Sequence, residues 1–310
     1  MAVETIETVL VPATVASTDG DNDADDQSTA SPYDLTDLAT VKDELNLSTT
    51  DTSNDAFLSR AITQASTAIA NYCNRVFAVE TVQDEIFIQQ DAYPWQTPGG
   101  VYPLQLSRWP IANSGVAGFT GNTHSSLVID NVSSVAGVTS GSLIFASDGS
   151  IPAGTSIENV GTRSLTLSAA ATGTAAAVGL NTGLQVIQTL SVNTTQALVH
   201  GTDYTIDAAR GWLIRLNPFT GISEKWEAVP VTVVYQGGYS AIPADLTDAV
   251  LRLVTARFKS RGRDPMLVDQ SQGPNLGSQR WWVGTVPGQK GPWPQEILGL
   301  VDRYRVPIAL

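Results

Sequence analysis

The sequence predicts an α+β fold: a helical bundle split between the two ends of the chain, a β-rich middle and an inserted all-β module. Three observations lead to this prediction. Apolar residues recur at helical spacing near both ends of the 310-residue chain. Short alternating runs between them indicate strands. Residues 113–185 combine such runs with many Ser, Thr, Gly and Ala residues and frequent turn signals, which is typical of a small β module.

Residues 1–32 are expected to form a flexible acidic arm. They hold few apolar groups after Val11, and the run Asp19–Asp26 concentrates negative charge. Burial of so few apolar groups cannot offset the conformational entropy that the segment would lose on becoming ordered. The triplet 9–11 (Val-Leu-Val) could still dock on another surface.

Residues 33–112 are predicted to form the first part of the core. Apolar residues from Leu35 to Leu45 recur at helical spacing, a polar turn follows at 48–54, and a longer helix with a broad apolar face runs to Cys73. Two amphipathic helices joined by a short polar turn predict an αα-hairpin. Strands are expected at 85–88 and 101–106.

The rest of the chain is expected to form three further segments. Residues 113–185 are the inserted β module. Residues 186–263 are the second part of the core, with three strands and a helix that begins after Pro243 and carries its basic residues toward its C-terminal end, which suits the helix dipole. Residues 264–310 are a C-terminal arm with a final short helix beginning at Pro294.

The charge distribution is uneven. The net charge is −13, and Lys42 is the sole basic residue among the first 55, whereas basic residues predominate from Arg252 onward. Such asymmetry suggests surfaces that meet different neighbours, and the overall acidity argues against tight binding of DNA phosphates. The N-terminus has no secretory signal pattern and no apolar run reaches the length of a membrane span. A soluble protein made in a reducing cytoplasm is expected.

The reactive side chains of the sequence favour a protein without catalytic activity or cofactor. Two histidines, His124 and His200, and the single Cys73 cannot build a structural Cys/His zinc site within one subunit. The acidic run fails as a calcium loop, because Ala24 and Ala30 occupy its glycine and glutamate positions. No phosphate-binding glycine loop or nucleophile elbow occurs.

Two features remain as binding candidates: the Trp- and Pro/Gly-rich C-terminal segment and the basic end of the helix that follows Pro243. Trp and Arg are preferred anchors at protein interfaces. One alternative left open is that the tryptophans cover the helical core. The basic residues could touch phosphates, dock on an acidic surface such as the acidic helices of a neighbouring subunit, or simply end a helix. The candidate docking residues are Arg257, Lys259, Arg261, Arg263, Arg280, Trp281, Trp282 and Trp293.

Several segments together resemble the head–tail adaptors, or connectors, of tailed bacteriophages. Residues 33–42 (YDLTDLATVK) and the helix through 65–77 (ASTAIANYCNRVF) look like the N-terminal αα-hairpin of that family. Residues 108–111, 201–207 and 211–213 resemble its middle. Residues 233–246 match the strand that leads into its third helix, and 263–265 and 294–307 match its end. The arm 1–32 and the insertion 113–185 depart from the family pattern.

This resemblance implies a structural protein of the virion neck, assembled in the host cytoplasm. Family members form a ring, typically dodecameric, beneath the portal, extend the DNA channel and present a surface to the tail or the next neck protein. The expected partners are further copies of the chain, the portal protein and a tail or neck completion protein, with no membrane partner. In relatives the C-terminal arm often contacts the portal, which here points to the stretch after Gly262.

DNA is expected to pass through the channel without tight binding, because an acidic lining repels it. The candidate channel-facing acidic residues are Asp34, Asp37, Asp43 and Glu44. The alternative function is that of a peripheral virion or adhesion protein whose β module binds a receptor or a glycan.

Overall fold

The computed structural model describes residues 3–13, 31–88, 101–115, 117–191, 194–261, 269–271, 278–280 and 293–306. The chain divides into two compact units, each assembled from segments distant in sequence. Unit 1 comprises Met1–Ala13 and Val79–Ser240, and unit 2 comprises Thr14–Ala78 and Ala241–Leu310.

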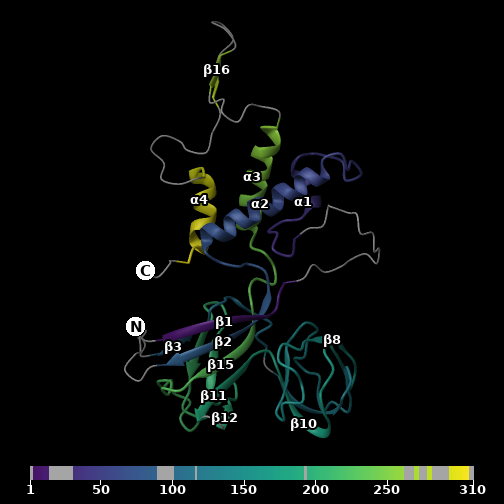
Figure 1. Cartoon of the computed structure of the whole chain (residues 1–310), viewed down its shortest axis with the longest axis vertical. Coiled ribbons are helices and arrows are strands. Elements are labelled where there is room, and N and C mark those ends of the chain that lie inside the picture. The colour runs from purple at the N-terminus through teal and green to yellow at the C-terminus, as the bar shows by residue number, and fades with distance from the viewer. Residues whose placement is uncertain are drawn as a thin grey trace. The chain divides into compact units, whose positions relative to one another are not determined.

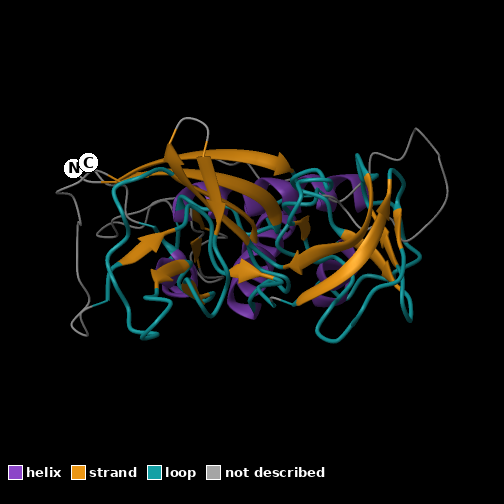
Figure 2. Ribbon diagram, turned by 90° about the horizontal axis from the view of Figure 1, so that it is seen from below, coloured by secondary structure: helices purple, strands orange, loops and turns teal. Residues whose placement is uncertain are grey.

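Strands dominate the fold, so the expectation of a helical bundle split between the chain ends is wrong. Of the described residues, 34% lie in strands and 22% in helices. Two of the four described helices have only seven residues each. Figure 2 shows the predominance of strands and loops over helices. Helical spacing located the helices, but a sequence does not show how much long-range pairing joins its short middle segments.

Unit 1 is built around a six-stranded sheet with the strand order β1-β2-β15-β11-β12 and with β4 also paired to β15. The strands are β1 (Val3–Val11), β2 (Glu80–Ile88), β4 (Ile111–Ala112), β11 (Gln185–Ser191), β12 (Thr194–Ala197) and β15 (Val231–Gly237). All pairings in this sheet are antiparallel. The strand expected at 231–235 is confirmed as β15, which is mostly buried and rich in the β-branched residues that favour strands.

Strand β1 corrects the expectation of a flexible arm for residues 3–11. It pairs with β2 in regular register from Val3↔Ile88 to Val9↔Val82. Its sequence, VETIETVLV, is rich in β-branched residues, which favour strands. The acidic run 19–26 determined the expectation for the whole arm, but that run lies outside the described residues.

A second sheet shares its core with the first. It has the order β13-β14-β3 and consists of β3 (Pro103–Gln105), β13 (Tyr204–Asp207) and β14 (Trp212–Arg215). Leu104 and Leu213 from this sheet pack in one buried cluster with Val82, Ile86 and Val233 from the larger sheet. The chain therefore forms a two-layer β structure here.

Residues 117–182 have a core of their own within unit 1. Two three-stranded sheets contribute to it, with the orders β5-β10-β7 and β6-β9-β8. The strands are β5 (Gly118–His124), β6 (Val128–Ile129), β7 (Ile144–Ala146), β8 (Ile157–Val160), β9 (Leu165–Leu167) and β10 (Thr174–Thr182). Ile144, Ile157 and Leu167 are fully buried in this core. A separate small cluster of Leu143, Phe145 and Val234 joins these residues to the main sheet.

Unit 2 contains the four described helices, drawn together in Figure 1. They are α1 (Leu38–Glu44), α2 (Asp55–Cys73), α3 (Ala244–Lys259) and α4 (Gln295–Val301), which a 3-10 turn, η1 (Asp302–Tyr304), extends. Helix α3 packs against α1, α2 and α4. A two-stranded ribbon, β16 (Asp269–Ser271) with β17 (Ser278–Arg280), also belongs to this unit.

Polar contacts tie the C-terminal helix to the rest of unit 2. The Tyr72 hydroxyl donates to Asp302 over 2.5 Å, and Arg252 on α3 bridges Asp248 at 3.0 Å and Glu296 at 3.3 Å. Cys73 is fully buried, and burial raises the pKa of its thiol to about 11. The thiol is therefore a packing group in this unit.

Candidate docking surfaces

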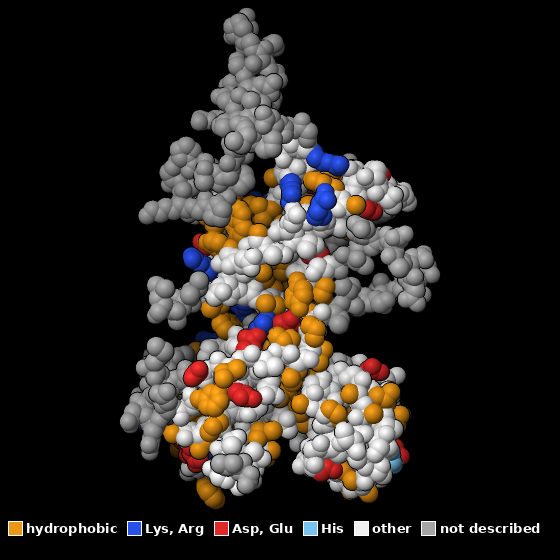
Figure 3. Space-filling model, in the orientation of Figure 1, with side chains coloured by type: hydrophobic (Ala, Val, Ile, Leu, Met, Phe, Trp, Pro, Cys, Tyr) orange, Lys and Arg blue, Asp and Glu red, His pale blue; other side chains and the backbone are white. Residues whose placement is uncertain are grey.

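A basic patch lies at the C-terminal end of α3. Arg257, Lys259 and Arg261 are exposed there, and Figure 3 shows Lys and Arg side chains gathered around apolar ones in this region. The Arg261 guanidinium lies 4.4 Å from the centroid of the Phe57 ring, and it donates to Asn54 over 2.6 Å. These four residues, Arg257, Lys259, Arg261 and Phe57, are called the basic patch below.

The packing of α3 against α2 positions the arginine side chains of the basic patch. The rings of Phe57 and Phe258 pack with centroids 6.3 Å apart and planes tilted by 54°, and Arg257 donates to Gln64 on α2. Stacking on an aromatic ring and a side-chain hydrogen bond restrict the arginines before any partner arrives. Less side-chain entropy is then lost on binding, and a guanidinium keeps further donors for a carboxylate.

The structure places the other predicted docking residues differently. Arg263, Trp281 and Trp282 lie outside the described residues, and Arg280 is described only as part of the backbone of β17. The half-buried Trp293 packs against α2, with its ring centroid 5.0 Å from that of Tyr72. This contact matches the alternative that a tryptophan covers the helical core.

The four acidic candidates fall into two pairs. Asp34 is half-buried, accepts hydrogen bonds from Ser31 N–H and the Thr63 hydroxyl, and has its pKa raised mainly by burial. Asp37 caps α1 by accepting from Thr40 N–H over 2.7 Å. Asp43 and Glu44, at the end of α1, are exposed. Asp34 and Asp37 thus serve local structure, and Asp37, Asp43 and Glu44 are exposed to solvent.

An apolar loop tip in unit 1 was not predicted from the sequence. Phe219 is 94% exposed and Ile222 is 68% exposed. Both lie between β14 and β15, in the segment Asn217-Pro218-Phe219-Thr220-Gly221-Ile222. The signal that could have identified it is an aromatic residue inside a Pro/Gly turn, where burial is not available.

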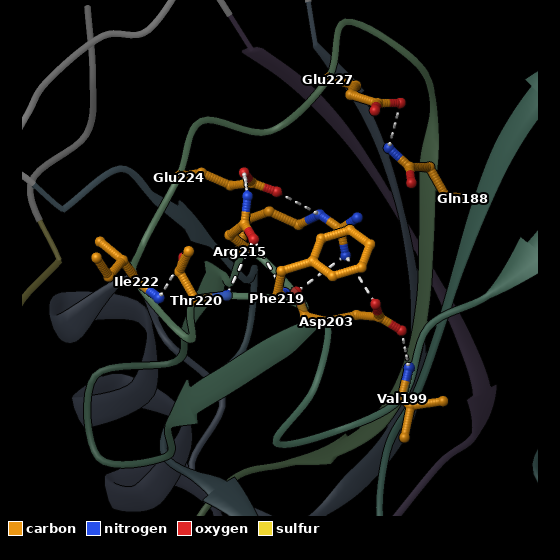
Figure 4. Close-up of polar contacts among 10 residues, drawn as sticks. Gln188, Val199, Asp203, Arg215, Phe219, Thr220, Ile222, Glu224 and Glu227 are labelled. Atoms are coloured by element: carbon orange, nitrogen blue, oxygen red, sulfur yellow. Dashed lines mark hydrogen bonds and ion pairs between the residues drawn. The ribbon is translucent and has the colours of Figure 1, made fainter.

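Hydrogen bonds hold this tip in one conformation. The Asn217 side chain accepts from the N–H groups of Phe219 and Thr220, over 3.0 and 3.2 Å, and donates to Glu224. Gly221, with φ +67°, closes the turn. Figure 4 shows Arg215 in contact with Asp203 and with Glu224, the residue that accepts from Asn217. A preorganised, exposed aromatic side chain is the usual form of an interface anchor.

Unit 1 also contains a buried polar cluster. The Arg108 guanidinium bridges Glu7 at 2.6 Å and the buried Glu80 at 2.9 Å. The fully buried Asp84 accepts from Ser107 and from the Tyr235 hydroxyl. Burial raises the pKa of Asp84 in spite of these hydrogen bonds. Because these polar groups bind one another, the cluster links strands β1, β2 and β15.

The described residues offer little reactive chemistry. Among them, no group of three or more His, Cys, Asp or Glu side chains could hold a metal ion. His124 lies 2.9 Å from Asp130 on the surface, and burial lowers the pKa of His200. In the same part of the chain, no helix has the length and apolarity required to cross a bilayer.

The segment that contains α1, α2 and β2 matches a known protein family. Residues 35–94 match the model of the phage gp6-like head-tail connector protein family. The resemblance to head–tail connectors is confirmed. The matched segment covers a minor part of the chain, and it includes Phe57 and Gln64, which contact the arginines at the end of α3. No curated protein matches the chain.

Solved structures with low similarity come from gene transfer agent particles. A chain from the neck of an empty particle with C6 symmetry has 13% identity and a TM-score of 0.37, covering 98% of this chain and 97% of that one. A chain from a native virion has 15% identity and a TM-score of 0.32, covering 91% and 95%. A chain from a native neck with C12 symmetry has 14% identity and a TM-score of 0.29, covering 88% and 90%. TM-scores below 0.5 do not establish a common fold.

Proposed function

We propose that this protein is a structural head–tail adaptor of the virion neck. It forms a homo-oligomeric ring under the portal, extends the DNA channel and provides the docking surface for the tail or the next neck protein. The observation that carries this proposal is the match of residues 35–94 to the connector family. The role requires shape, charge and docking in place of catalysis.

Within this proposal the basic patch contacts the portal. Its arginines are exposed and already restricted by Phe57 and Gln64, which suits recognition of an acidic protein surface. Arg263, Arg280, Trp281 and Trp282 extend the proposed contact along the C-terminal arm. Asp43 and Glu44 are the acidic residues assigned to the channel wall, where they keep DNA from binding tightly.

Charge reversal of the basic patch tests the portal contact. The triple variant Arg257→Glu, Lys259→Glu, Arg261→Glu should bind the portal protein of the same phage at least about tenfold more weakly, because interface charges of the wrong sign repel. The control carries the same charge change in unit 1, at Arg163, Arg210 and Lys225. Affinity is measured by biolayer interferometry on immobilised portal.

The melting temperatures of both triple variants must match that of the wild-type protein for the comparison to hold. Equal loss of portal binding in the two variants would reject the assignment to the basic patch. Failure of the wild-type protein to bind portal, together with its absence from the neck in electron micrographs of virions, would reject the adaptor role. Strong, salt-sensitive DNA binding by the ring would reject the acidic channel wall.

The tip at 217–222 is the proposed contact with the tail-side partner. Replacing Phe219 with Ala should lower the fraction of tailed particles about thirtyfold, the effect expected from loss of an interface anchor worth about 2 kcal/mol. The phage lacking this gene is complemented with each variant, and particles are counted by electron microscopy. Leu127→Ala, which also removes an exposed apolar side chain (45% exposed), should leave tail joining unchanged. Normal joining with Phe219→Ala would contradict the assignment.

A further inference from the structure

The six-stranded sheet of unit 1 has two open edges among the described residues. Strand β1 lies at one end of the strand order and β12 at the other. Each pairs with a single described strand, β1 with β2 and β12 with β11. The outer N–H and C=O groups of such edge strands can pair with a strand from another chain.

Strand β1 is exposed on both of its faces. Ile6 is 49% exposed and Val9 is 41% exposed, and because they are three residues apart their side chains point to opposite faces of the strand. The strand is held to unit 1 by its pairing with β2, by the Glu7–Arg108 contact and by Leu10, which packs against the cluster of Leu143, Phe145 and Val234. A nine-residue edge strand with exposed apolar side chains on both faces is characteristic of an unoccupied pairing site.

We propose that β1 of one copy pairs with β12 of the next copy, so that the sheet continues from subunit to subunit around the ring. This inference rests on the ring of the proposed function and adds the contact that closes it. The occupant of each edge is therefore a second copy of the same chain.

Charge and symmetry favour this pairing over the two alternatives. Pairing β1 with β1 would bring Glu4 and Glu7 of two copies together, and like charges on neighbouring strands are unfavourable. Strand β12 carries no charged residue, and all four of its residues are exposed. Pairing either edge with itself gives a closed two-fold dimer, whereas joining two different edges repeats from copy to copy and can close into a ring.

Hydrogen exchange tests the pairing directly. Exchange is compared between the free protein and the ring assembled on portal, for peptides that cover 3–11 and 194–197. Both peptides should exchange at least about tenfold more slowly in the ring, because amides in a ladder open rarely. A peptide that covers β8, an edge strand of another sheet in unit 1, serves as the control and should not change.

A substitution in β12 supplies an independent test. Thr195→Glu places a carboxylate in β12, beside a β1 strand of the next copy that carries Glu4 and Glu7, and should lower the yield of rings at least about tenfold. Asn159→Glu, on the exposed part of β8, is the matched control. A full yield of rings from Thr195→Glu contradicts the pairing.

The outcomes separate this inference from the proposed function. Rings whose β1 and β12 exchange as fast as in the free protein overturn the edge pairing and leave the ring intact. Protection of β1 alone also overturns it, because the occupant of β1 is then not β12. Failure to form rings on portal overturns the ring itself, and the pairing with it.

Discussion

An Arg108→Ala variant should lose about 3–5 kcal/mol of unfolding free energy, because removing one member of a buried ion pair leaves the other charge in a poor environment. Glu80 is only 5% exposed and lies 2.9 Å from Arg108 Nη1. The second partner, Glu7, lies on β1, so the substitution also weakens the attachment of the N-terminal strand. Urea denaturation followed by circular dichroism measures the loss.

Two further variants test the cause of this loss. Glu80→Gln in the Arg108→Ala background removes the negative charge that Arg108 no longer offsets and should recover part of the lost free energy. Arg163→Ala, an exposed arginine in the same unit, should change stability by less than about 0.5 kcal/mol. If Arg108→Ala is no more destabilising than Arg163→Ala, the cluster does not hold unit 1 together.

The second large effect is expected from Ile157→Ala. Ile157 is fully buried in the core of residues 117–182, and such truncations cost about 2–5 kcal/mol because a cavity remains. That core is distinct from the core of the two-layer structure, and the small cluster of Leu143, Phe145 and Val234 joins them. The destabilisation should therefore be confined to residues 117–182.

Peptide-resolved hydrogen exchange measures where this destabilisation falls. Peptides from β5, β7 and β10 should exchange faster in Ile157→Ala, while those from β2 and β15 keep the wild-type rate. Val128→Ala removes a side chain that is 45% exposed in the same core region and should have little effect. Faster exchange throughout unit 1 would show that the two cores unfold as one.

The sequence located elements best where local rules determined them. Helices α2, α3 and α4 follow from apolar spacing and from the prolines before α3 and α4, and strands β13, β14 and β15 follow from β-branched and aromatic runs. The proportion of strand to helix was misjudged because strand content depends on pairing between segments that are distant in the sequence. One example is β1, whose residues pair with residues of β2 that lie 70 to 85 positions away in the sequence.

For the candidate sites too, local features could be predicted from the sequence and features that arise on folding could not. The basic residues of α3 are visible in the sequence, but their support from Phe57 and Gln64 arises only when α2 packs against α3. Asp37 could be recognised as a helix cap from its position, whereas the burial of Asp34 could not. Phe219 was missed because its degree of exposure depends on how the chain folds around the turn.

The ends of the segment 117–182 meet at one point of unit 1. Ala117 N–H donates to the Thr182 hydroxyl over 3.0 Å, and Thr182 N–H donates to the Ala117 carbonyl over 3.0 Å. The flanking strands β4 and β11 both pair with β15. Because entry and exit are adjacent, the intervening residues can be exchanged for another cassette of unrelated sequence without lengthening the path of the main sheet. The same junction offers a place to insert a foreign domain into this protein.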